Sequence, residues 1–207
     1  MIHGISTFLY APLADEAAKT YSEPPAKLSG AIEATPNINF NSQTIYSDNK
    51  LKHKDVSFSD GTIDLTVDFE NKEILSPLYG RKVVKGTFTP SGDNAETITV
   101  KKHISNSGDI SVPQGFGYII SDFDVDNKKD VYTVRFFYKV EFAPSFQTIR
   151  TREGSKTYTA AQLTGTIYEL PNGDWMEEVD FDDVNVAIEY LNSLFVQETQ
   201  EAETQEA

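Results

Sequence analysis

The segment Val131–Phe142 constrains the fold most strongly, because apolar and polar residues alternate along it. A period of two is that of a β-strand with one buried face. The side chains predicted to share this face are Tyr132, Val134, Phe136, Tyr138, Val140 and Phe142. The opposite, wet face carries Thr133, Arg135, Lys139 and Glu141. The chain also has thirteen Phe and ten Tyr, which pack well on a pleated surface, so a mainly β fold is predicted.

Turn signals and further alternating segments divide the rest of the chain into strands. Strands are predicted near residues 31–40, 83–89, 96–103, 115–125, 145–151, 161–169 and 174–181. Pro36 indicates that the first of them is an edge strand, because proline cannot donate to a neighbour. Asp60-Gly61, between the alternating runs at residues 56–59 and 62–69, predicts a tight hairpin, and Asn172-Gly173 predicts a second. Gly115 and Gly117 indicate a bulge or a close backbone approach.

Two short helices are predicted beside the sheet. Asn71–Tyr79 has an N-cap residue at its start and Gly80 after its end. Asp183–Phe195 places its apolar side chains on one stripe: Val184, Ala187, Ile188, Leu191 and Phe195. The predicted organisation is an N-terminal arm (1–30), a β domain (31–182) with a long polar loop at Asn41–Lys54, a C-terminal helix (183–196) and a disordered acidic tail (197–207).

The charge is distributed unevenly along the chain. The formal net charge is −14, and the residues from Thr157 to the C-terminus include twelve acidic side chains and no Lys or Arg. Phosphate binding needs clustered basic residues, so this pattern disfavours binding of nucleic acid. It is compatible with a surface that repels DNA. The chain has no cysteine, which excludes disulfides and thiolate metal sites. No window resembles a membrane helix, and no membrane partner is predicted.

Sites for chemistry are few, and no cofactor or metal is predicted. Zinc-protease, nucleophile-elbow and P-loop patterns do not occur. His3, His53 and His103 are interpreted as exposed polar residues. Asp122–Asn127 resembles the start of a calcium loop, but Asn127 replaces the usual glycine and Thr133 stands where the bidentate Glu is needed. We interpret this segment as the end of a strand.

The acidic run near the C-terminus has two further interpretations. Carboxylates between Asp174 and Asp183 could form a glycosidase-like pair, although such a run is more often a solvated face. Trp175, the single tryptophan, could stack on a sugar or pack beside Asn172-Gly173. A carbohydrate-binding β-sandwich of a phage baseplate or cell-surface protein is therefore the alternative function, and an acidic hydrolase is a third.

Three stretches resemble the major tail tube proteins of long-tailed, siphovirus-type bacteriophages in the order of their residues and in the positions of their Pro and Gly residues. The first runs from Leu9 to Asn37 and contains Tyr-Ala-Pro-Leu, a Pro before Lys-Leu, and Gly-Ala-Ile. The second, Thr44 to Leu51, is similar to the family's Tyr-Ala-Asp-Asp segment, from which Ser47 and Asn49 depart. The third, Phe137 to Glu178, resembles the late strands with their Asn-Gly or Asp-Gly hairpin.

The resemblance implies a β-sandwich or split barrel of the tail-tube type with one or two flanking helices. Copies of the chain, six in number, would close a ring, and stacked rings would form the tube through which double-stranded DNA passes without specific binding. The implied setting is the virion tail, assembled from protein made in the cytoplasm of a bacterial host. The implied partners are further copies, the tape measure protein, the tail terminator and the distal tail protein. No enzymatic activity is expected.

Three sets of residues are candidates for this assembly. The wet face proposed to line the lumen comprises Ser57, Ser59, Asp64, Thr66 and Asp68. The loop proposed to contact other subunits or rings contributes Asn41, Gln43, Tyr46, Asp48, Lys50, Lys52 and Lys54. The arm proposed to contact neighbours contributes Phe8, Tyr10, Pro12 and Leu13. Acidic groups on a lumen wall would repel DNA over roughly 8 Å at physiological salt.

Overall fold

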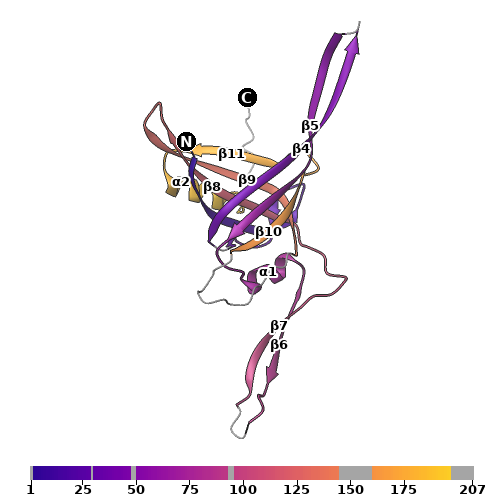
Figure 1. The fold of residues 1–207 in the computed structure, drawn as a ribbon, viewed down its shortest axis with the longest axis vertical. Coiled ribbons are helices and arrows are strands. Elements are labelled where there is room, and N and C mark those ends of the chain that lie inside the picture. The colour runs from indigo at the N-terminus through magenta and orange to yellow at the C-terminus, as the bar shows by residue number, and fades with distance from the viewer. Residues whose placement is uncertain (1, 29, 48–49, 93–95, 145–159, 197–207) are drawn as a thin grey trace, which may run out of the picture.

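The computed structural model describes residues 2–28, 30–47, 50–92, 96–144 and 160–196 (Figure 1). Strands make up most of this part of the chain, which confirms the predicted mainly β fold. The strands are β1 (Ile2–Asp15), β2 (Thr20–Tyr21), β3 (Ala26–Lys27), β4 (Ala31–Ser47), β5 (Lys50–Val67), β6 (Lys82–Phe88), β7 (Ile98–Ile104), β8 (Gln114–Asp124), β9 (Lys129–Ala143), β10 (Ala161–Tyr168) and β11 (Met176–Phe181). The helices are α1 (Lys72–Leu78) and α2 (Val184–Ser193).

One large antiparallel sheet forms the body of the molecule. Its strand order is β2-β1-β8-β9-β10-β5-β4, with β3 paired to β1 and β11 paired to β9. The sheet is bent so that β1 and β4, which are not paired, lie close together. In the described residues β4 pairs only with β5, so the sheet does not close into a barrel. β6 and β7 form a separate two-stranded sheet, which we call the ribbon.

β9 is the central strand, and a bulge divides its buried residues between two clusters. Gln114 pairs with Val140 while Phe116 pairs with Phe137, so β9 contains an extra residue at this point. Val134, Phe136 and Tyr138 lie in the cluster beneath α2, whereas Val140 and Phe142 lie in the main core. The prediction of one shared face from Tyr132 to Phe142 is therefore wrong, because the bulge reverses the alternation.

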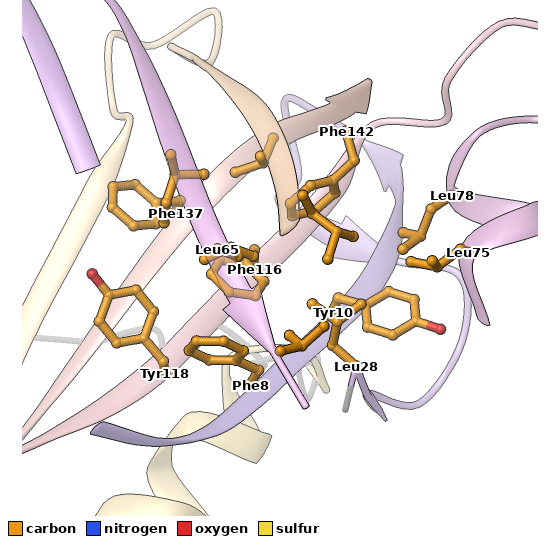
Figure 2. Packing of buried hydrophobic residues seen from close by; sticks show 14 of the residues in the cluster. Phe8, Tyr10, Leu28, Leu65, Leu75, Leu78, Phe116, Tyr118, Phe137 and Phe142 are labelled. Carbon is orange, nitrogen blue, oxygen red and sulfur yellow. The ribbon is translucent and has the colours of Figure 1, made fainter. Parts of the chain in front are cut away.

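The main core is rich in aromatic side chains (Figure 2). Phe8 of β1, Phe116 of β8 and Phe142 of β9 are fully buried, and their ring centroids lie 5.5 Å (Phe8–Phe116) and 5.7 Å (Phe116–Phe142) apart. Tilted and edge-on ring pairs at this spacing stabilise a core beyond the area that they bury. Leu75 and Leu78 of α1 cover one end of this core.

The second cluster lies between the sheet and α2. Ala187, Leu191 and Phe195 are buried there, which confirms the apolar stripe predicted for the helix. Gly117 permits this contact, because a Cβ at that position would lie 2.5 Å from Leu191 Cδ1. The predicted close approach at Gly117 is confirmed. Asp183 caps the helix by accepting a hydrogen bond from the Asn185 N–H at 2.7 Å.

The N-terminal segment differs from the predicted arm. Residues Ile2–Asp15 are strand β1 and pair with β8. Phe8 and Tyr10 lie in the main core while Leu9 and Ala11 lie in the cluster beneath α2, so both faces of β1 are buried. Residues buried on both faces give no alternation in the sequence, and for this reason the strand was not predicted.

Strands β4 and β5 also differ from the prediction. β5 runs unbroken through Asp60-Gly61, so the hairpin turn predicted there is wrong. Gly61 instead allows a close approach, because a Cβ would lie 2.8 Å from Ile38 Cδ1. The polar loop predicted over Asn41–Lys54 is mostly strand, since the ends of β4 and β5 pair from Asn41–Ser57 to Ser47–Lys50.

The turn signals at other sites have mixed outcomes. α1 begins after Asn71, whose side chain accepts from the Glu73 N–H at 3.0 Å, and Gly80 follows it with a φ of 66°, as predicted. Asn172-Gly173 forms a turn but no hairpin, because β10 and β11 both pair with the same edge of β9. The strand predicted at 145–151 and the tail at 197–207 lie outside the described residues.

Candidate assembly surfaces

The hairpin of β4 and β5 projects well beyond the sheet, as Figure 1 shows. We call its outer part, residues 41–57, the long hairpin. Of the residues predicted to contact other subunits, it carries Asn41, Gln43, Tyr46, Lys50, Lys52 and Lys54. Asp48 lies outside the described residues. The predicted contact segment therefore extends from the body as a paired ribbon and not as a loop.

Apolar side chains are exposed at the base of the long hairpin. Phe40 is 55% exposed and Val56 is 58% exposed. Phe40 lies opposite Phe58, whose ring stacks on Trp175 with centroids 4.6 Å apart. The apolar surface thus begins in the core and continues onto the projecting strands. Exposed apolar groups beside a core are typical of protein contact sites.

The outer face of β5 is polar, as predicted for Asp64 and Thr66. Ile63, Leu65 and Val67 are buried, while Asp64 is exposed and Thr66 is half-buried. Thr164 of β10 donates to Asp64 Oδ1 at 2.7 Å, and Thr35 of β4 lies opposite Asp64. These strands therefore form a continuous face of threonines and carboxylates across β4, β5 and β10, which we call the threonine–acid face. Its members are Glu33, Thr35, Thr62, Asp64, Thr66, Gln162 and Thr164.

The remaining residues predicted for the wet face lie in different surroundings. Ser57 pairs with Asn41 in the long hairpin and is exposed. Ser59 falls at a bulge, because Asn39 pairs with Asp60 and Phe40 pairs with Phe58. Asp68 lies after the end of β5, where its carboxylate accepts from the Gly30 N–H at 2.8 Å. Asp68 is therefore part of a structural contact and not of the open face.

The basic side chains of β9 meet acids within the same chain. Arg135 pairs with Glu178 of β11, which lies directly opposite it, and also donates to the Tyr118 hydroxyl at 3.1 Å. Lys139 Nζ lies 2.6 Å from Glu16 Oε1. Both side chains therefore have acidic partners within the same chain.

The residues predicted as arm contacts belong to the body of the protein. Phe8 is fully buried and Tyr10 is nearly so, and Leu13 packs against the cluster beneath α2. Pro12 lies opposite Gln114 of β8 and is half-buried. The prediction that Phe8 and Tyr10 contact a neighbour is therefore wrong, since these side chains stabilise the sheet from inside.

The ribbon of β6 and β7 is a projecting element that the sequence interpretation did not single out. Figure 1 shows it extending from the end of the molecule opposite the long hairpin. Its root is held by α1: the buried Ser76 hydroxyl lies 2.7 Å from His103 Nδ1, and Lys101 pairs with Glu73. His103 is thus half-buried and hydrogen-bonded, unlike the exposed residue predicted. Two apolar segments with lysines and no acids, Lys82–Phe88 and Ile98–Ile104, were the signal that could have identified it.

A cluster of tyrosines around Glu177 lines a small cavity of about 170 Å³. The Tyr190 hydroxyl of α2 donates to Glu177 Oε1 at 2.7 Å, and the Tyr138 hydroxyl donates to the other carboxylate oxygen. Burial and then the hydrogen bond to Glu177 raise the pKa of Tyr190 to about 12. Lys19 pairs with Asp174 at 2.7 Å and lies over the Tyr138 ring. This network joins α2 to β9 and β11.

The other chemical interpretations can be placed on the structure. Trp175 stacks on Phe58 and also lies against Phe137, so its ring packs on the protein's own aromatic residues. Asp124 ends β8, and its carboxylate accepts from the N–H groups of Asp126 and Asn127.

Among the described residues, no group of three or more His, Asp or Glu side chains could hold a metal ion. No helix in the described ranges has the length and apolar character of a membrane span.

Comparison of the chain with protein-family models found no match, and comparison with curated proteins found no similar sequence. Function is therefore inferred from the geometry of the chain and from the sequence resemblance described above.

Proposed function

We propose that this protein is the ring-forming subunit of a phage tail tube, and that it works by assembling with copies of itself. The observation that carries the proposal is the presence of two paired-strand projections at opposite ends of one sheet domain. In each projection, most of the side chains whose burial is described are exposed. Projections of this kind gain stability when they pack on another molecule.

The long hairpin supplies the first contact. Its outer strands pair only with each other in the described residues, and Phe40 and Val56 present apolar surface at its base. β4 is also an edge strand, and Pro36 within it fits that position. A ring of identical subunits covers such edges, whereas a free monomer leaves them open to unwanted pairing.

The threonine–acid face supports a role as the lumen wall. It carries Glu33 and Asp64 but no Lys or Arg among its members, and hydroxyl groups occupy most of the other positions. A wall of this chemistry offers no cation to phosphate groups and repels DNA at short range. Double-stranded DNA could therefore slide along it without binding.

The glycan-binding alternative requires an aromatic ring face that is open to a sugar. Trp175 lies in a stack with Phe58 instead, and it contacts the main core. The acidic-hydrolase alternative requires two carboxyl groups that face each other. Glu177 is instead surrounded by tyrosine hydroxyls and lies beside Lys19 in the cavity.

Sedimentation velocity on the purified chain tests the proposal. We expect large, concentration-dependent species for the natural sequence. A variant in which residues 43–55 are replaced by Asn-Gly should fold but not form them, because Ser42 and Val56 pair directly and a two-residue turn preserves their register. A natural chain that sediments as a monomer at every concentration would contradict the proposal.

A further inference from the structure

The ribbon of β6 and β7 has an apolar face that nothing in the described part of the chain covers. Phe88 lies opposite Ile98 and is 56% exposed, while Ile98 is 51% exposed. Ile104 lies on the same face and is also exposed, because directly opposed and alternate residues share one side of an antiparallel pair. An isolated two-stranded hairpin is at best marginally stable in water, so this face requires a partner.

The charge of the ribbon indicates what kind of partner it fits. Its strands carry Lys82, Lys85, Lys101 and Lys102 and no acidic residue. The whole chain has a formal net charge of −14, so removing these four cations leaves −18 on the remainder. The ribbon is thus the basic element of an acidic protein, and another copy of the same protein is complementary to it in charge.

A matching surface exists at the turn between β8 and β9. Val125 is exposed there, and the exposed residues of the same turn include Asp126 and Asp130 together with Lys128. The first turn of α2 is close by, because Lys129 Nζ lies 2.7 Å from Asp182 Oδ1, and it adds the exposed Val186. This surface, which we call the acidic tip, combines apolar side chains with carboxylates (Asp126, Asp130 and Asp182) that outnumber its lysines (Lys128 and Lys129), whereas the strands of the ribbon combine apolar side chains with lysines alone.

The positions of the two surfaces permit a repeating contact. In Figure 1 the ribbon extends from the lower end of the molecule, while the turn between β8 and β9 lies at the upper left, beside the N-terminus. A contact between two different surfaces does not close on itself as a two-fold dimer does. It can instead be repeated from copy to copy along an axis.

We propose that the ribbon of one copy docks on the acidic tip of a copy in the next ring, with Phe88 and Ile98 packed against Val125 and Val186. The inference rests on the proposed function, because it names the contact between rings that a tube requires. Lys82 and Lys102, which share the face of Phe88 and Ile98, then face the aspartates of the tip. The contact weakens as salt is raised, since part of its stability comes from exposed charge pairs.

Cysteine cross-linking tests this contact cleanly, because the natural chain has no cysteine. An equimolar mixture of Phe88→Cys and Val125→Cys chains should form a disulfide between copies under mild oxidation, and neither variant alone should do so to the same extent. Ile110→Cys in place of Phe88→Cys is the matched control, since Ile110 is exposed but lies outside the ribbon. Equal cross-linking by the control would overturn the proposed docking.

Assembly measurements provide the second test. Phe88→Ser with Ile98→Ser should raise the concentration needed for assembly on the order of tenfold or more, because central apolar contacts dominate an interface. Lys102→Glu should weaken assembly, whereas Lys27→Glu, an equal change at an exposed site outside the ribbon, should not. Circular dichroism checks that each variant is folded.

The outcomes separate the two proposals. A natural chain that never assembles contradicts the proposed function. A natural chain that assembles, with ribbon variants that assemble equally well, overturns only the docking of the ribbon. The docking proposal would also be overturned if the natural chain bound DNA in a salt-dependent way and Lys102→Glu abolished this binding without changing assembly. The ribbon would then be a nucleic-acid-binding element.

Discussion

Gly30 and Asp68 extend the pairing of β4 with β5 beyond Ala31 and Val67 through a pair of hydrogen bonds. The Gly30 N–H donates to Asp68 Oδ1 at 2.8 Å, and the Asp68 N–H donates to the Gly30 carbonyl oxygen at 3.0 Å. Just before Gly30 the chain is still bound to β1, because the Leu28 N–H donates to the Phe8 carbonyl oxygen at 3.0 Å. Leu28 is thus bound to β1 and Gly30 to the residue that follows β5, although β1 and β5 are not paired with each other.

Gly30→Ala should destabilise the fold by about 1–3 kcal/mol, the usual cost of overpacking. A Cβ at this position would lie 2.3 Å from Asp68 Oδ2, so the carboxylate must move and its hydrogen bond is lost. Chemical denaturation measures the change in the free energy of unfolding. Gly4→Ala is the control, because its Cβ would lie 3.8 Å from Ser121 Cβ, an ordinary contact. Equal stability of the two variants would contradict the importance of this junction.

The stability of the protein should fall as pH rises from about 10 to about 12. Burial and the hydrogen bond to Glu177 raise the pKa of Tyr190 to about 12, whereas an unfolded tyrosine titrates near 10. A group whose pKa is higher in the folded state contributes stability below its unfolded pKa and loses it as pH rises through the folded value. Burial also raises the pKa values of Tyr21 and Tyr138.

Urea unfolding at a series of alkaline pH values measures this dependence, and absorbance of tyrosinate follows the titration itself. Tyr190→Phe removes one titrating group and should make the fall in stability shallower. Tyr168→Phe is the control, since Tyr168 is exposed. If both variants retained the full slope, the hydroxyl network that joins α2 to the sheet would not be responsible for it.

Phe58→Ala should lower the free energy of unfolding by about 1–3 kcal/mol and shift the emission of Trp175 to longer wavelength. The Phe58 ring stacks on Trp175 at 4.6 Å, and its loss opens the indole to water. Trp175 is the single tryptophan, so fluorescence reports on this site alone. Phe40→Ala, on the exposed residue opposite Phe58, should leave stability within about 0.5 kcal/mol of the natural chain but weaken assembly. If Phe40→Ala lowered stability and Phe58→Ala did not, the assignment of Phe58 to the core and of Phe40 to an assembly contact would be contradicted.

Asp64→Lys should leave the fold intact and make assembled tubes retain DNA. Asp64 is exposed, and its hydrogen bond from Thr164 lies on the surface, so little stability is lost. A cation on every subunit of a lumen wall would attract phosphate groups and slow the passage of DNA. The measurement is co-sedimentation of DNA with tubes at low and physiological salt. Glu189→Lys, a change of equal charge at an exposed site on α2, serves as the control, and identical retention by the two would argue against a lumen at Asp64.

Alternation predicted the parts of the fold that have one wet and one buried face. Ile63, Leu65 and Val67 are buried as predicted, and the stripe on α2 was predicted correctly as well. Phe8–Ala11 was misread because both faces of β1 are covered. The outer strands of the long hairpin were misread for the opposite reason, since a strand with no core beneath it has no apolar face.

The sequence interpretation was wrong where a glycine makes room for a neighbouring side chain and does not form a turn. Asp60-Gly61 has the composition of a turn, yet Gly61 lies within β5 because Ile38 occupies the space of a Cβ. The bulge in β9 also leaves no local signal in the sequence, because it is visible only in the pairing of β9 with β8. Of the candidate assembly residues, those on the long hairpin and on the outer face of β5 could be located from sequence, whereas the ribbon required the structure.

Self-assembly is tested most directly by electron microscopy of the purified chain in negative stain. We expect rings, or tubes built of stacked rings, whose central channel fills with stain. Isolated particles of a single 23.1 kDa chain at all concentrations, with the long hairpin and the ribbon unengaged, would contradict the proposal that this protein acts by joining copies of itself.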